Sequence, residues 1–236
     1  MAMLHVVTGD QYRIIDRRMR EIKRQLDQDG GSPLDPNWVA GELQRIIDAS
    51  GKVLTGLADW QEFYRNLFGL EVDLSGLVVP AKKKGFDRLI VVAPGMTPQR
   101  LYDKCAELFT CWKWTNEDLD KIVRSERTAK DGAYAVWFRD TVEADEDLKN
   151  LSANYLKERD IPGITLEERF LMELKYFKET SSHLDIVNWT LCSGSRCSGG
   201  SVPGVLWRPY GRRLSVRWCF PEDSGPTSLR SRRAVS

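Results

Sequence analysis

Histidine is scarce in this chain of 236 residues, which contains only His5 and His183. Because histidine is the usual proton carrier of enzymes at neutral pH, this scarcity disfavours general acid–base catalysis. The sequence also lacks a glycine-rich phosphate loop, a dinucleotide-binding fingerprint, a hydrolase nucleophile elbow and a paired-histidine zinc motif. We therefore expect a protein without enzymatic activity.

The cysteines do not form a metal-binding pattern. Cys192 and Cys197 are separated by four residues, no Cys-x-x-Cys pair is present, and no histidine follows closely. Zinc sites use closely spaced cysteine and histidine ligands, so the sequence predicts no metal and no other cofactor. The consecutive acids of residues 143–147 lack the spacing of a calcium loop and predict a solvated helix start.

Long hydrophobic runs are missing as well. No run approaches the ~18 apolar residues of a membrane-spanning helix, and the first twenty residues do not resemble a secretory signal. These features predict a cytoplasmic protein with reduced thiols and no membrane span.

Charge is balanced overall but unevenly placed. The net charge is +1, and 42% of the residues are hydrophobic, as in a soluble globular protein. The segment 203–236 nevertheless has two acids against seven arginines, which are Arg208, Arg212, Arg213, Arg217, Arg230, Arg232 and Arg233. Such asymmetry points to the tail as a surface for partners.

The patterning predicts an α+β fold in three parts. We expect a helical region over residues 1–70, a mixed α/β region over 71–180 and a β-rich module over 181–236.

The helical region begins with a predicted αα-hairpin over residues 8–49. Thr8 and Gln11 can form a capping box, and Asp35 before Pro36 is typical of a second helix start. A short helix is expected at 59–67. The apolar face of the first helix comprises Tyr12, Ile15, Met19, Ile22 and Leu26.

An arginine stripe lies on the other side of that first helix. Its members are Arg13, Arg17, Arg20 and Arg24, a pattern that could contact nucleic-acid phosphates. The i,i+4 pairs Asp16–Arg20 and Arg17–Glu21 favour a solvated helix face instead.

The mixed region contains one clear βα unit. Residues 88–92 predict a strand, 93–96 a turn, and Thr97 with Pro98 the start of a helix. A helix capped by Thr115 and extending to Val123, a strand at 134–138, and helices at 146–159 and 165–179 are expected to follow. Thr165 and Glu168 can form a capping box.

The tail changes to strand-like patterning. We expect a strand at 186–192, a loop at 193–204, and two strands within 205–220 around a turn near residues 209–211. Period-two alternation predicts that Leu214, Val216 and Trp218 face the core. The same alternation exposes Arg213, Ser215, Arg217 and Cys219, as a recognition surface or as a soluble edge.

Two resemblances follow from these residues. The body, including residues 85–140 and 165–180, resembles a group of uncharacterised proteins from uncultivated bacteria, which implies no activity. The tail, residues 191–236, resembles the variable region of diversity-generating-retroelement target proteins, although GGSVPGVLW is only a loose echo of the usual GGSW core.

The second resemblance implies a C-type-lectin-like fold with a fixed framework, here Val205, Trp207, Leu214, Val216 and Trp218, and a fixed closing segment at 229–236. The implied ligand-binding positions are Arg208, Tyr210, Arg212, Arg213, Ser215, Arg217 and Cys219.

The leading hypothesis is a non-enzymatic protein that binds a protein or another macromolecule through its basic, aromatic tail. A first alternative is a nucleic-acid-associated protein, such as a mobile-element accessory, that uses the N-terminal arginine stripe and the tail. A second is an enzyme of unrecognised type built around His183, a cysteine and carboxylates.

Overall fold

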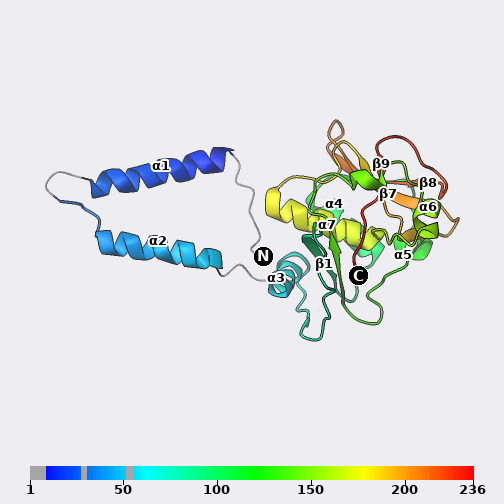
Figure 1. Cartoon of the computed structure of the whole chain (residues 1–236), viewed down its shortest axis with the longest axis horizontal. Coiled ribbons are helices and arrows are strands. Elements are labelled where there is room, and N and C mark those ends of the chain that lie inside the picture. The colour runs from blue at the N-terminus through cyan, green and yellow to red at the C-terminus, as the bar shows by residue number, and fades with distance from the viewer. Residues whose placement is uncertain (1–8, 28–30, 52–55) are drawn as a thin grey trace. The chain divides into compact units, whose positions relative to one another are not determined.

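The computed structural model describes residues 9–27, 31–51 and 56–236. It divides into two compact units, Met1–Glu62 and Phe63–Ser236. Helices and strands follow one another irregularly along the chain (Figure 1), and the strands form separate sheets. This arrangement confirms the expected α+β class. The predicted capping box of Thr8 and the residue His5 lie outside the described part.

The first unit contains α1 (Gly9–Leu26) and α2 (Pro36–Gly51), which confirms two helices of the predicted hairpin. Asp35 accepts a hydrogen bond from the Asn37 backbone N–H at 2.8 Å, as expected for a helix cap. The predicted apolar face is open at its start, because Tyr12 is 66% and Ile15 54% exposed. Helix α3 (Leu57–Phe68) contains the boundary between the units.

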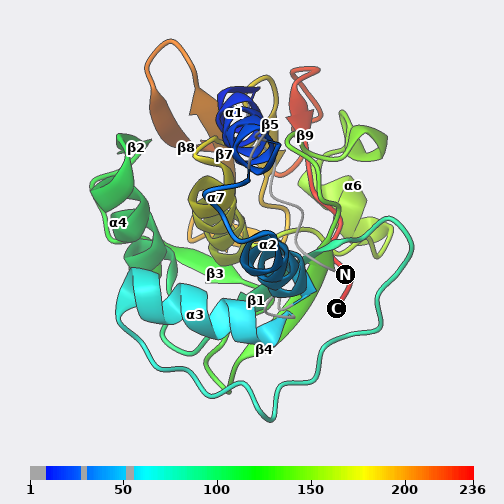
Figure 2. The same ribbon diagram turned by 90° about the vertical axis from the view of Figure 1, so that its left-hand side faces the viewer.

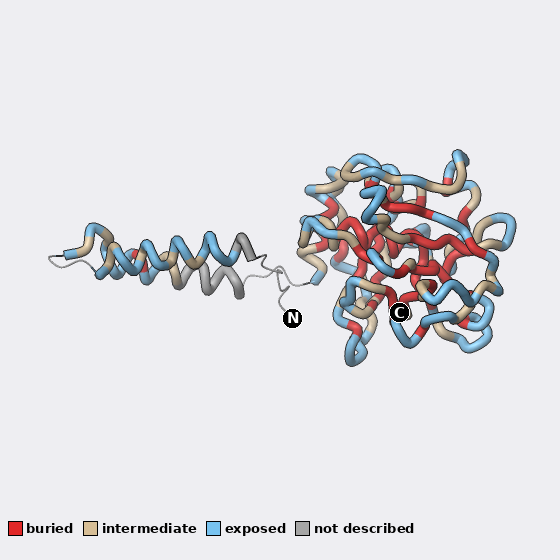
Figure 3. The backbone as a smooth tube through the Cα atoms, turned by 90° about the horizontal axis from the view of Figure 1, so that it is seen from above, coloured by how far each residue is buried: buried red, intermediate tan, exposed pale blue. Residues whose placement is uncertain are grey.

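In the second unit, β1 (Arg88–Val92) pairs antiparallel with β4 (Tyr134–Phe138). The predicted βα unit is confirmed: Thr97 caps α4 (Pro98–Leu108), and Pro98 stands at its start. Helix α7 (Leu166–Thr180) has the predicted capping box of Thr165 and Glu168 and packs against both α4 and β1. Buried segments gather inside this unit, with exposed loops around them (Figure 3).

A five-stranded sheet has the order β2-β8-β7-β5-β9. Its strands are β2 (Cys111–Lys113), β8 (Arg213–Cys219), β7 (Val202–Arg208), β5 (Trp189–Leu191) and β9 (Leu229–Arg230). The two end strands pair parallel with their neighbours, and the inner pairs are antiparallel. Figure 2 shows β2 and α4 at one side of this sheet, next to β8.

Strands from the predicted middle and C-terminal regions share sheets. Strand β2 extends the sheet of the tail, and β3 (Val123–Ser125) pairs antiparallel with β6 (Ser195–Cys197). The tail is therefore integrated with the residues that precede position 180.

Three predicted elements differ from the observed ones. The Thr115-capped helix is replaced by the short α5 (Leu119–Ile122), which Asp118 caps and β3 follows directly. The helix expected at 146–159 is broken into the 3₁₀ turn η1 (Glu146–Leu148) and α6 (Ala153–Glu158), because Asn150 has a positive φ of 58° and Ser152 starts a new helix. The loop expected at 193–204 contains β6.

The segment after β9 is buried in the core of the second unit. Arg232 is 1% exposed, and its guanidinium donates to Asp185 Oδ1 and the Val142 carbonyl, both at 2.8 Å. Asp185 also accepts from Arg169 Nε of α7 at 2.9 Å. Val235 forms an isolated bridge with Trp137 of β4. These contacts join α7, the β1–β4 sheet and residues 232–235 in one network.

Only part of the acidic run 143–147 is the predicted solvated helix start: Glu146 and Asp147 form the first turn of η1, and their side chains are 68% and 49% exposed. Glu143 accepts hydrogen bonds from the backbone N–H groups of Ile186, Val187 and Asn188 at 2.8–3.2 Å. Asp145 is 3% exposed, and it accepts from the Arg233 backbone N–H at 2.8 Å. For Glu143 and Asp145 the prediction was wrong, because these two carboxylates bind segments that are distant in sequence.

Candidate recognition surface

The hairpin of β7 and β8 separates the tail residues onto two faces of the sheet. Residues paired across an antiparallel ladder project to the same side, and the pairs Trp207–Leu214 and Val205–Val216 place four apolar residues on the inner face. Leu214 and Val216 are fully buried. Trp207 stacks on the His183 ring, with 3.3 Å between the ring centroids. The inward prediction for Leu214 and Val216 is confirmed.

The outer face carries three arginines. Arg208 pairs directly with Arg213, and Arg217 pairs with Gly204 on the same side. We call Arg208, Arg213 and Arg217 the arginine face. The guanidinium of Arg213 lies over the Trp112 ring of β2, 5.7 Å from its centroid. On the other side, Trp189 of β5 lies against Gly204 so closely that a Cβ there would be 2.8 Å from the ring.

Burial differs from the predicted alternation at three positions. Ser215 is 0% and Cys219 5% exposed, whereas Trp218 is 43% exposed. Ser215 lies on an inner strand between β2 and β7, and its neighbours in register are Trp112 and Leu206. The predicted exposure of Ser215 and Cys219 was wrong. Trp218 lies on the inner side by register, opposite Pro203, but it is not buried in the core as predicted.

Each of these differences has a packing reason. Cys219 belongs to an apolar cluster with Ala153 of α6, Leu191, Val202 and Leu229, so α6 covers this end of the outer face. Trp218 stands near the end of β8 and forms an edge-to-face pair with Phe220, with centroids 5.1 Å apart. Whether Ser215 or Cys219 contacts a ligand stays a prediction.

Two other predicted site residues lie at the turn. Tyr210 is fully exposed, and Arg212 is exposed with a positive φ of 45°. The remaining arginines of the tail have structural partners. Arg230 pairs with Glu146, Arg232 with Asp185, and Arg233 approaches Asp147 at 4.0 Å.

The arginine face has no such partners. Within the described residues, no carboxylate lies at ion-pair distance from Arg208, Arg213 or Arg217. The pKa of Arg217 is lowered by its burial and by the positive charges of Arg208 and Arg213. The basic excess that the sequence assigned to the whole tail is therefore concentrated, unpaired, in this cluster and at the turn.

The N-terminal arginine stripe is partly paired. Arg20 bonds to Asp16, and Arg24 bonds to Glu21 at 2.7–2.9 Å. The Arg24 guanidinium lowers the pKa of Glu21 to about 2. Arg13 and Arg17 line a shallow hollow along α1 with the other two arginines of the stripe. Arg20 thus forms the predicted pair with Asp16, whereas Glu21, which was predicted to pair with Arg17, bonds to Arg24.

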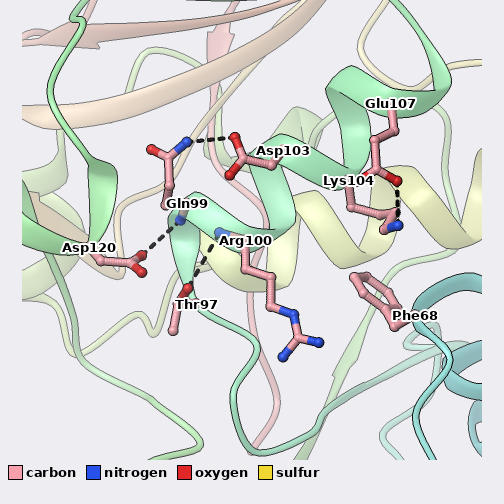
Figure 4. A pocket seen from close by; sticks show the side chains of 8 residues that line it. All are labelled: Phe68, Thr97, Gln99, Arg100, Asp103, Lys104, Glu107 and Asp120. Carbon is pink, nitrogen blue, oxygen red and sulfur yellow. Dashed lines mark hydrogen bonds and ion pairs between the residues drawn. The ribbon is translucent and has the colours of Figure 1, made fainter.

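A cavity of about 460 Å³ lies beside the start of α4 (Figure 4). The Gln99 backbone N–H donates to Asp120 at 2.8 Å, and that of Arg100 donates to Thr97 at 3.4 Å. Lys104 is paired with Glu107. Because a carboxylate already occupies the helix start, the arrangement agrees with the predicted plain βα turn.

His183 has a carboxylate partner, as the enzyme hypothesis requires. Its Nδ1 lies 2.8 Å from Glu173 Oε1, but Arg169 donates to the other oxygen of Glu173 at 2.8 Å. Burial and the Glu173 charge raise the pKa of the Cys111 thiol to about 12, and burial raises the pKa of Cys105 well above its usual value. Protonated thiols are poor nucleophiles, so this cluster does not favour covalent catalysis.

The described residues contain no group of three potential ligands that could hold a metal ion. None of the described helices is long and apolar enough to span a membrane. No family model matches the chain, and no curated protein or solved structure is similar to it. The resemblance of the tail therefore stays a prediction.

Proposed function

We propose that the protein is a binding protein whose recognition surface is the arginine face together with Trp112 and the β7–β8 turn. One observation carries this proposal: three arginines are gathered on one side of a sheet without a carboxylate among their described neighbours. Like charges placed opposite each other destabilise a sheet. A cluster that weakens the fold is best explained by a partner that it binds.

The strands beneath the recognition surface form a framework that is compatible with sequence variation at the surface. Strands β7 and β8 are held between β2 and β5 by backbone hydrogen bonds, and their inner face packs on the core through Val205, Leu214 and Val216. The outer arginines Arg208, Arg213 and Arg217 can therefore vary without loss of this framework, unlike the buried outer residues Ser215 and Cys219. This division supports, as part of the proposal, a diversified target protein with a C-type-lectin-like tail.

Sequencing the segment 202–220 in many cells of one population tests the diversification. Substitutions should concentrate at Arg208, Arg213 and Arg217 and at the turn residues Tyr210 and Arg212. The inner positions should stay constant, since changes there create cavities or strain in the core. Equal variation on both faces would refute the diversification.

Capture experiments test the recognition surface itself. The full chain is immobilised, and the wild type is compared with the triple variant Arg208→Ala/Arg213→Ala/Arg217→Ala. The control Lys83→Ala/Lys84→Ala/Lys121→Ala removes the same charge at exposed positions elsewhere. Partners retained by the wild type and the control but lost by the arginine variant support the proposal, and equal capture by all three contradicts it.

Nucleic-acid binding is the second candidate, favoured by the hollow along α1 that Arg13, Arg17, Arg20 and Arg24 line. It predicts binding that weakens steeply as salt rises. Replacement of the four arginines by alanine should abolish this binding, and unchanged binding would exclude the stripe.

A further inference from the structure

The arginine face contains hydrogen-bond donors that have no acceptor. Arg208 Nε, Arg213 Nε and Ser215 Oγ are buried atoms without a hydrogen-bond partner, and Ser215 itself is 0% exposed. Most buried polar groups in proteins are paired, because an unpaired one loses its hydrogen bonds to water without replacement. Arg230 Nε and Arg233 Nε are unpartnered too, but those guanidinium groups have carboxylates at Nη, so the arginine face is distinguished by unpaired donors gathered on one side without a carboxylate.

The charges of the site point to the sign of that acceptor. Arg208 and Arg213 face each other across the ladder, and both lower the pKa of Arg217. The partly buried arginines Arg139 and Arg230, by contrast, each have a carboxylate partner. An anion would supply both the missing acceptor oxygens and the missing negative charge.

The number of arginines distinguishes between anions. A guanidinium presents Nε and one Nη as a fork that matches two oxygens. A carboxylate offers two oxygens and one charge, whereas a phosphate monoester offers three oxygens and about two charges. Three adjacent guanidinium groups are matched better by the phosphate.

The borders of the site limit the ligand to one such group. Trp112 flanks the arginine face at β2, Trp189 flanks it at β5, and the apolar cluster beneath α6 closes it beyond Arg217. Lys113 projects to the other face and is bonded to the Glu117 carbonyl. A nucleic-acid strand requires a basic track for several phosphates, and this face does not provide one.

We propose that the arginine face binds a single phosphate monoester, carried by a phosphorylated side chain of a protein partner. The forks of Arg208 and Arg213 hold its oxygens, Arg217 adds charge, and the exposed ring of Trp112 contacts the adjoining peptide. This inference rests on the proposed function, because it takes the same face as the recognition surface.

The arginine Nε–H resonances of the full-length protein report on the site directly. They are assigned with the single variants Arg208→Lys and Arg213→Lys, then followed by NMR during titration with a phosphoserine peptide at constant ionic strength. We expect saturable shifts of both resonances. The unphosphorylated peptide and acetate should leave them unchanged.

Two variants separate the site from general charge. Arg217→Gln should weaken phosphopeptide binding by about tenfold or more, as loss of a charge-assisted contact does. It should also raise the thermal midpoint, because a repulsion is removed, which verifies that the variant is folded. The control Lys83→Gln/Lys84→Gln/Lys121→Gln should bind like the wild type.

Several outcomes would overturn the inference. If acetate shifts the Nε–H resonances as much as the phosphoserine peptide does, the site binds carboxylates. If inorganic phosphate binds as tightly as the phosphoserine peptide, the site does not recognise a protein partner. Tighter binding of a single-stranded oligonucleotide, with a salt dependence of several phosphates, would assign the face to nucleic acid. If phosphopeptide binding fails while partner capture still depends on the arginines, the inference falls and the proposed function stands.

Discussion

Replacement of Arg232 by methionine should destabilise the second unit strongly. The side chain is 1% exposed and donates to Asp185 Oδ1 at 2.8 Å, the Val142 carbonyl at 2.8 Å, the Thr141 carbonyl at 3.0 Å and Thr190 Oγ1 at 3.2 Å. Methionine fills part of the volume but leaves the buried Asp185 carboxylate with Arg169 as its one remaining cation. Removing one member of a buried ion pair costs about 3–5 kcal/mol.

Urea unfolding followed by tryptophan fluorescence measures this loss. Arg233→Met is the matched control, because Arg233 is 37% exposed and reaches its acid, Asp147, only at 4.0 Å. Exposed pairs contribute about 0–1 kcal/mol, so this neighbour should unfold nearly like the wild type. A loss below about 1 kcal/mol for Arg232→Met would refute the role assigned to the network.

Two further predictions concern the start of α7. Glu167 is 5% exposed beneath Ser125, and burial raises its pKa from 4.5 to about 7. The folded state therefore binds this proton more tightly than the unfolded state, so the free energy of unfolding should fall as pH rises from about 5 to 7, by up to roughly 3 kcal/mol. Urea titrations at both pH values should show a smaller fall for Glu167→Gln, and an unchanged fall would contradict the raised pKa. A Cβ at Gly163 would lie 1.7 Å from Ser193 Oγ, so Gly163→Ala should lower stability by about 1–3 kcal/mol or more. Gly199→Ala has open space and should be near neutral in the same thermal unfolding assay, and similar losses for both would contradict the close approach.

Local signals in the sequence were sufficient for the elements with strong caps and regular patterns. Thr97 with Pro98 located α4, the Thr165–Glu168 capping box located α7, and β-branched residues located β1. Strands β2 and β9 were missed because two or three residues carry no periodicity. They are strands because distant segments pair with them.

The candidate site was predicted in part for the same reason. Alternation placed Arg213 and Arg217 on the outer side of β8, and the structure agrees. The position of Trp112 depends on the parallel pairing of β2 with β8, which no local signal indicates. The burial of Ser215 follows from the same pairing, because β2 lies on one side of its backbone and β7 on the other.

The position of residues 229–235 also has a consequence for folding during translation. A ribosome delivers them after every other strand of the sheet, so Asp185 meets Arg232 only once the hairpin of β7 and β8 has been translated. A frameshift anywhere in that hairpin would replace Arg232 and Val235 and leave the network open. The hairpin is thus followed by a segment whose packing depends on the reading frame. Chains with a shifted frame lack the pair of Arg232 and Asp185, so we expect them to fold less stably.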